Sequence, residues 1–93
     1  MKLTDLDPRW YVAVEGGPHV GFTFECPHCR TQRLGVAVHE HGLIDVDHAD
    51  IQAGYVWDMT GDQFESLSLS PSVDVSKYGH WHGFIRNGEV TNA

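Results

Sequence analysis

The stretch Trp-His-Gly-Phe-Ile-Arg-Asn-Gly-Glu-Val-Thr, at residues 81–91, decides the predicted fold of this chain. Asn87-Gly88 supplies the two positive-φ residues of a type I′ turn, which is the preferred two-residue link of a β-hairpin. We therefore expect residues 81–86 and 89–91 to form two antiparallel strands.

Alternating apolar residues predict more strands upstream of this hairpin. Residues 9–15 and 19–25 alternate on either side of Gly16-Gly17-Pro18, which indicates a second hairpin. Shorter strands are expected within 34–38, 55–57 and 67–73, whereas residues 42–54 are expected to form a loop with at most one helical turn. One face of the second hairpin should carry Trp10, Val12, Val14, Val20, Phe22 and Phe24.

Composition agrees with a small packed domain. No window of the sequence shows the 3.6-residue period of a helix, so we predict a mostly β fold, a single antiparallel domain over residues 1–93. Hydrophobic residues make up 41% of the chain and charged residues 20%, which is enough for a packed core. A domain of this size has a thin stability margin, which a metal ion or a disulfide would widen.

The charge balance excludes some classes of partner. Thirteen acidic residues face six basic ones, and the resulting net charge of −7 disfavours nucleic-acid binding, which needs a basic face. No apolar run approaches the roughly 20 residues of a membrane-spanning helix. The first residues also lack the apolar core of a signal peptide. We therefore expect a cytoplasmic protein with no membrane contact.

Cys26-Pro27-His28-Cys29 has the spacing of half a zinc knuckle, and a reducing cytoplasm favours a metal site over a disulfide. The chain has no second cysteine pair, so histidines must supply the other ligands. His80-Trp81-His82 would present two imidazoles on one face of the expected strand, far in sequence from the cysteines. We predict a structural Zn²⁺ held by Cys26, Cys29, His80 and His82, with His39 and His41 as substitutes.

Other interpretations stay open from the residues alone. His39, Glu40 and His41 would suit a small metal-dependent hydrolase with Glu40 as its general base. The net charge of −7 would suit an acidic mimic of nucleic acid. The three serines around Pro71 lack a Gly-x-Ser-x-Gly elbow and an evident orienting acid. We therefore do not expect a nucleophile among Ser68, Ser70 and Ser72. The serines before and after Pro71 should instead bond local amides and fix a bend.

Three motifs follow one another in the second half of the chain: Trp57, then Leu69-Ser70-Pro71-Ser72-Val73, then His82-Gly83-Phe84-Ile85-Arg86-Asn87-Gly88. With the upstream Cys26 and Cys29, this pattern resembles an uncharacterised family of small phage and bacterial proteins. Relatives often have a cysteine just before the histidine of the last motif, where this chain has His80-Trp81. A histidine in place of a cysteine keeps a zinc ligand. The resemblance implies a small, metal-stapled, phage-encoded β domain.

The sequence thus leads to one functional expectation. The half knuckle, the His-x-His segment and the absence of a complete catalytic constellation indicate a small zinc-binding phage-type protein. We expect it to be a non-enzymatic domain that works by contacting a host or phage protein.

Overall fold

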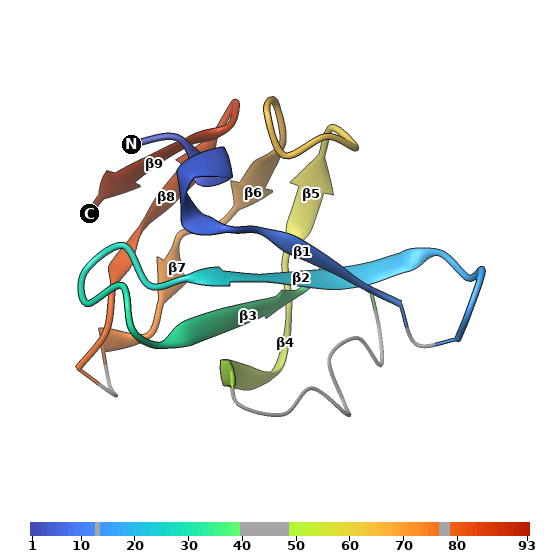
Figure 1. Cartoon of the computed structure of the whole chain (residues 1–93), viewed down its shortest axis with the longest axis horizontal. Helices are drawn as coiled ribbons and strands as arrows, with labels where there is room; N and C mark the ends of the chain where they lie inside the picture. Colours follow the sequence, from blue (N-terminus) through green and yellow to red (C-terminus); the bar gives the residue numbers. More distant parts are fainter. Residues whose placement is uncertain (13, 40–48, 77–78) are drawn as a thin grey trace.

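The computed structural model describes residues 1–12, 14–39, 49–76 and 79–93, with residues 49–54 described as backbone. These parts contain one short 3-10 helix and a series of strands (Figure 1). In chain order they are η1 (Leu3–Leu6), β1 (Arg9–Val12), β2 (His19–Glu25), β3 (Arg33–Ala37), β4 (Ala49–Val56), β5 (Asp58–Thr60), β6 (Ser68–Ser70), β7 (Val73–Asp74), β8 (His82–Arg86) and β9 (Glu89–Asn92).

The strands form three sheets, with the orders β1-β2-β3-β4, β5-β6 and β7-β8-β9. The predicted mostly β class is confirmed. The expectation of an entirely antiparallel fold is wrong at one pair, because β3 and β4 run parallel. A parallel pair needs a crossover connection rather than a tight turn, and no turn motif lies between these two strands to signal their pairing.

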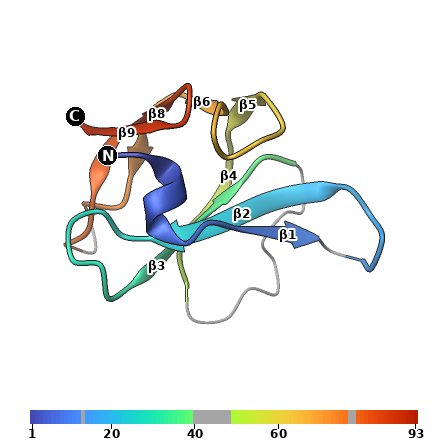
Figure 2. The same cartoon turned by 45° about the horizontal axis from the view of Figure 1, so that its top comes forward.

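The predicted C-terminal hairpin is confirmed. Strands β8 and β9 pair antiparallel across Asn87 and Gly88, whose φ angles of 50° and 75° fit the type I′ turn. The start of the chain lies beside β9 (Figure 2), since Lys2 pairs with Glu89 in an isolated bridge. The Leu3 N–H also donates to the Gly88 carbonyl oxygen at 2.8 Å. These bonds place η1 against the hairpin.

The expectation of a loop over residues 42–54 is wrong at its end, because residues 49–54 belong to β4. Residues 42–48 lie outside the described part of the chain. Helix η1 was not expected, because four residues are too few to show a period. The described residues contain no helix with the length and apolar character that a bilayer crossing requires.

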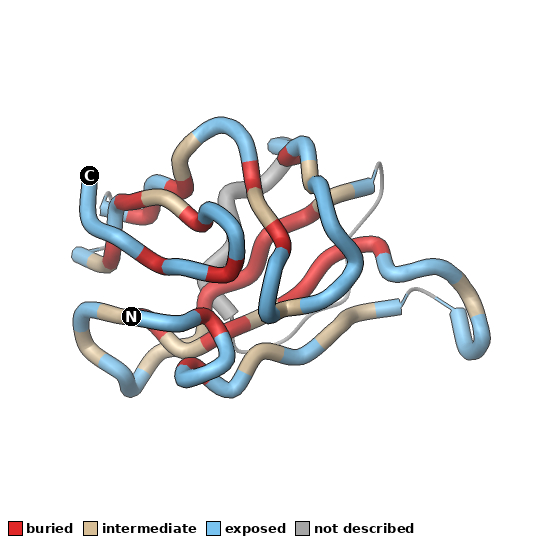
Figure 3. Tube along the Cα trace, turned by 90° about the horizontal axis from the view of Figure 1, so that it is seen from above, coloured by how far each residue is buried: buried red, intermediate tan, exposed pale blue. Residues whose placement is uncertain are grey.

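Side chains from all three sheets and from η1 meet in one buried cluster. Figure 3 marks the buried residues along the chain in red. The prediction for β2 is confirmed, since Val20, Phe22 and Phe24 are at most 5% exposed. The prediction for the preceding strand is wrong beyond Trp10, because Val12 is 36% and Val14 is 65% exposed. Strand β1 ends at Val12, and the turn that follows projects from the body of the molecule, so these two valines have no core to cover.

Two matched substitutions test this placement of the core. Val36→Ala removes two methyl groups from a fully buried β3 side chain and should lower the free energy of unfolding by about 2 kcal/mol. Val14→Ala makes the same chemical change at the exposed turn and should stay within about 0.5 kcal/mol of the parent. Urea unfolding measures both values. Equal losses would contradict the assignment of Val14 to the surface.

Candidate functional site

Ser72 and His82 face each other in the described structure. The Ser72 Oγ lies 3.4 Å from the His82 Nε2, in reach of a hydrogen bond between hydroxyl and imidazole. Ser72 is half-buried and His82 is exposed, so both side chains are accessible to a substrate. A hydroxyl next to an imidazole nitrogen is the arrangement in which histidine can take the proton of a nucleophilic serine.

The pairing of β7 with β8 produces this contact. Ser72 immediately precedes β7, and Asp74 pairs with His82, so Ser72 and His82 are diagonal neighbours on one face of the ladder. Gly83 is needed at this point, because a Cβ there would collide with the Thr91 carbonyl oxygen and with the ring of Trp81. The buried Trp81 lies beneath β8, so the backbone beside His82 is held in place by the core.

Trp57 holds the serine from the other side. Its indole Nε1 donates to the Ser72 carbonyl oxygen at 3.2 Å, and the side chain is 2% exposed. A buried indole needs a partner for its single N–H group, and here that partner is the backbone of Ser72. Trp57 therefore fixes the position of Ser72 without contacting its hydroxyl.

Asp74 adds a negative charge next to this pair, since its Cα is directly opposite that of His82 in the β7–β8 ladder. Hydrogen bonds from the hydroxyl and the backbone N–H of Ser76 hold the pKa of the Asp74 carboxyl below its ordinary value. The charge of His82 acts in the same direction. Asp74 is therefore ionised at neutral pH and places a negative charge across the ladder from His82.

A second group of reactive side chains comprises Cys26, Cys29 and His80. One ligand atom from each lies within 4.8 Å of the other two, and the Cys29 Sγ is 3.7 Å from the His80 Nδ1. Cys26 is buried, and Cys29 and His80 are half-buried. The structure thus brings together three of the four residues predicted as zinc ligands, close enough to hold a metal ion.

Local backbone bonds shape the cysteine segment that follows β2. The Arg30 N–H donates to the Cys26 carbonyl oxygen and the Cys26 N–H donates to the Gln32 carbonyl oxygen, each at 2.8 Å. Hydrogen bonds from the hydroxyl and backbone N–H of Thr31, followed by the backbone N–H of Gln32, lower the pKa of the Cys29 thiol to about 6. Because a thiolate is the form that binds a metal, this turn prepares Cys29 as a ligand.

Within the described residues, the other predicted ligands, His82 and His39, are outside this group of three. His82 is not part of the group of three, because β8 begins at His82 and His80 precedes it, so strand alternation does not put the two imidazoles on one face. The buried Trp81 separates them, with His80 near the cysteines and His82 near Ser72. His39 is exposed, whereas Glu40 and His41 fall outside the described residues.

Ser68 Oγ accepts the Asn87 N–H at 2.8 Å, which joins β6 to the β8–β9 turn. The expectation for Ser72 is wrong, because its hydroxyl meets a distant side chain rather than a local amide. Ser72 contacts His82, ten positions away in sequence. The sequence carries no local signal for this contact, because it depends on the two-residue pair of β7 with β8.

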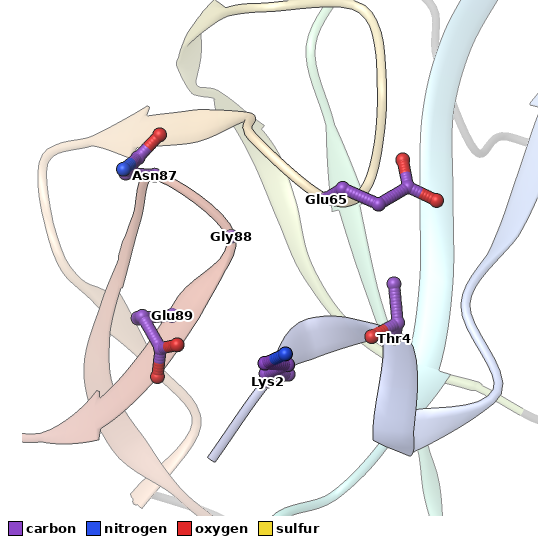
Figure 4. Close-up of a pocket in the computed structure, with 6 residues that line it drawn as sticks. All are labelled: Lys2, Thr4, Glu65, Asn87, Gly88 and Glu89. Carbon is purple, nitrogen blue, oxygen red and sulfur yellow. The ribbon is translucent and has the colours of Figure 1, made fainter.

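A groove of about 510 Å³ lies next to Ser72, and its walls are residues 68–72 together with Phe84 and Arg86. A smaller hollow of about 130 Å³ lies where the N-terminal segment meets the β8–β9 turn (Figure 4). Lys2, Glu65 and Glu89 give that hollow charges of both signs, and neither Ser72 nor His82 lines it. The larger groove is thus the one that Ser72 lines, and His82 is reached from it only through its contact with Ser72.

Comparison with known proteins adds one finding. A family model described as "Bacterial ubiquitination-like system serine protease (BubE)" matches residues 2–93. No curated protein and no solved structure matches the chain significantly.

The family match overturns the functional expectation from the sequence. A phage-type, non-enzymatic interaction domain is wrong, because the family is described as one of bacterial serine proteases. The same description replaces the metal-dependent hydrolase built on His39, Glu40 and His41, and the acidic mimic of nucleic acid. Since the match spans nearly all of its residues, the chain belongs to the BubE family of bacterial ubiquitination-like system serine proteases.

Proposed function

We propose that this protein is a serine protease of a bacterial ubiquitination-like system, with Ser72 as nucleophile and His82 as general base. The observation that carries the proposal is the 3.4 Å contact between the Ser72 Oγ and the His82 Nε2 in a chain of a serine protease family. Catalytic hydrogen bonds are often long in the absence of substrate and shorten when it binds, so this distance suits the role.

The chemistry assigned to each residue follows from the geometry. His82 Nε2 takes the hydroxyl proton as Ser72 Oγ attacks the carbonyl carbon of the scissile amide. The protonated His82 then gives that proton to the leaving amine, which leaves an acyl group on Ser72 for hydrolysis by water. Asp74 stabilises the imidazolium through its charge, since it lies opposite His82 and stays ionised.

Covalent labelling tests the nucleophile without knowledge of the substrate. A fluorophosphonate probe should form a phosphonyl ester with Ser72, with loss of fluoride, and peptide mapping by mass spectrometry identifies the labelled residue. His82→Ala should abolish labelling, because no base then activates the hydroxyl. Ser66→Ala, at an exposed serine outside the site, should be labelled like the parent. Labelling at another serine, or none at all, would contradict the assignment.

We also propose that Cys26, Cys29 and His80 hold a structural Zn²⁺. Tetrahedral zinc with Zn–S of about 2.3 Å and Zn–N of about 2.0 Å separates sulfur and nitrogen by about 3.5 Å. The 3.7 Å between the Cys29 Sγ and the His80 Nδ1 is close to that value. Two thiolates with an imidazole are also a donor set that zinc prefers. When bound, the ion would tie the segment that follows β2 to His80, two residues before β8 begins.

Native mass spectrometry tests the metal. The purified protein should carry one zinc, and Cys29→Ser should remove it. His28→Ala is the matched control, because His28 is exposed between the two cysteines and is not among the three grouped residues. Loss of zinc in the control but not in Cys29→Ser would refute this ligand set.

Trp57→Phe tests how the serine is positioned. The change removes the N–H that holds the Ser72 carbonyl oxygen while keeping an aromatic ring in the core. We expect kcat to fall about tenfold with KM within twofold, because a small displacement of the nucleophile slows attack more than it weakens binding. Steady-state kinetics measures both constants. A rise in KM alone would show that Trp57 serves binding instead.

A further inference from the structure

The groove beside Ser72 carries a single charged residue. Residues 68–72 and Phe84 contribute hydroxyl groups, a proline and an aromatic ring, and Arg86 contributes the only charge in the lining. The net charge of the chain is −7, so a cation in this groove contrasts with the acidic balance of the whole molecule. The groove is therefore a place where a negative group on a substrate would be attracted.

Arg86 differs from the other three arginines in its contacts. Arg9 and Arg33 pair with Asp7, and Arg30 pairs with Glu25. Arg86 has no carboxylate within ion-pair distance among the described residues, and its Cζ lies 4.1 Å from the centre of the Phe84 ring. Stacking on an aromatic face orients a guanidinium while leaving its N–H groups available for a carboxylate.

The spacing along β8 relates Arg86 to the catalytic pair. His82, Phe84 and Arg86 alternate with the buried Gly83 and Ile85, so the first three share the outer face of the strand. Four residues of a strand span about 13 Å. An extended peptide that lies along this face with its scissile bond beside His82 would therefore reach Arg86 with its third or fourth residue.

We propose that the groove is a substrate subsite that binds an extended peptide and pairs Arg86 with an Asp or Glu side chain three or four residues from the scissile bond. The inference rests on the proposed protease function, and it adds a substrate preference that the catalytic pair alone does not impose. Arg86 is a specificity-determining residue in this scheme, since it touches substrate but not the reacting atoms.

Cleavage of a peptide library derived from a bacterial proteome tests the preference. Mass spectrometry of the products from the full chain should show acidic residues enriched about tenfold at the third or fourth position on one side of the cut. Arg86→Gln should remove the enrichment, and Arg86→Glu should replace it with enrichment of Lys and Arg. Arg9→Gln removes an exposed arginine from outside the groove and should leave the profile unchanged. Acidic enrichment that is absent, or that persists in Arg86→Gln, would overturn the proposal.

A binding experiment tests the subsite independently of the proposed protease activity. Immobilised Ser72→Ala protein, which lacks the nucleophile, should retain acidic peptides from the same library, and the added Arg86→Gln change should release them. Retention without cleavage by the parent would support the subsite and contradict the protease. Amidated and free-acid versions of the library distinguish side chains from a terminal carboxylate. Selection that depends on a free C-terminus would reject an acidic side chain as the ligand.

Discussion

Ser72→Ala is expected to lower kcat/KM by about 10⁴-fold or more, and His82→Ala by a similar factor. Ser72→Ala removes the nucleophile and His82→Ala removes its base. Neither side chain can perform its proposed role without the other. The double variant should lose no more than the single ones, because residues that act as one unit give non-additive losses. The measurement is steady-state cleavage of the best peptide from a library screen.

Controls distinguish lost chemistry from lost structure. Ser72 is half-buried and His82 is exposed, so both variants should unfold within a few degrees of the parent temperature. Ser66→Ala and His28→Ala, at exposed positions, should keep full activity. Cys29→Ala tests the alternative that the nucleophile is the Cys29 thiol, which lies beside His80. If that variant lost cleavage without losing stability, and Ser72→Ala retained it, the serine mechanism would be wrong.

Removal of the proposed zinc is expected to lower the thermal midpoint of unfolding by about 10 °C or more. Cys26 is fully buried, and the ion would join the segment after β2 to His80. An ion that binds only the folded chain stabilises it by its binding free energy, and a domain of this size has little stability to spare. A melt in excess chelator, followed by one with zinc restored, measures the loss and its reversal.

Variants that lack a metal ligand should have the same melting temperature as the parent in chelator. Cys29→Ser and His80→Ala should melt at the temperature of the chelated parent and show no further change with chelator. His28→Ala should melt like the zinc-loaded parent, because His28 is outside the group. Unfolding of the parent that is insensitive to both chelator and added zinc would exclude a structural metal.

Local signals explain the elements that could be predicted. The turn at Asn87-Gly88 needs only two residues with positive φ, and the alternation of Val20, Phe22 and Phe24 reflects a strand with one buried face. The sequence indicates only the end of β4, at residues 55–56, because β4 joins β3 in parallel through a connection with no turn motif. The prediction that Val14 is buried is wrong because the apolar alternation continues in the sequence beyond Val12, where the pairing of β1 with β2 ends.

In the candidate sites, too, only the residues that are close in sequence could be predicted to lie together. Cys26 and Cys29 are close in sequence, and the spacing alone brings them together. His82 was assigned to the same ion because His80 was expected to share its strand, but the strand begins one residue after Trp81. The position of Ser72 depends on the ladder between β7 and β8, which has only two residue pairs. A strand of two residues is too short to show the alternation by which strands are predicted.

The pairing of β7 with β8 has a consequence for how such an enzyme can change. Ser72, Asp74 and His82 all come from residues 72–82, whereas one wall of the groove comes from β6 and the other from the far end of β8. In the proposed scheme Ser72 belongs to both the reactive pair and the groove, whereas the β6 residues and Arg86 belong to the groove alone. Substitutions in β6 or at position 86 are therefore expected to change substrate preference while Ser72 and His82 stay in place.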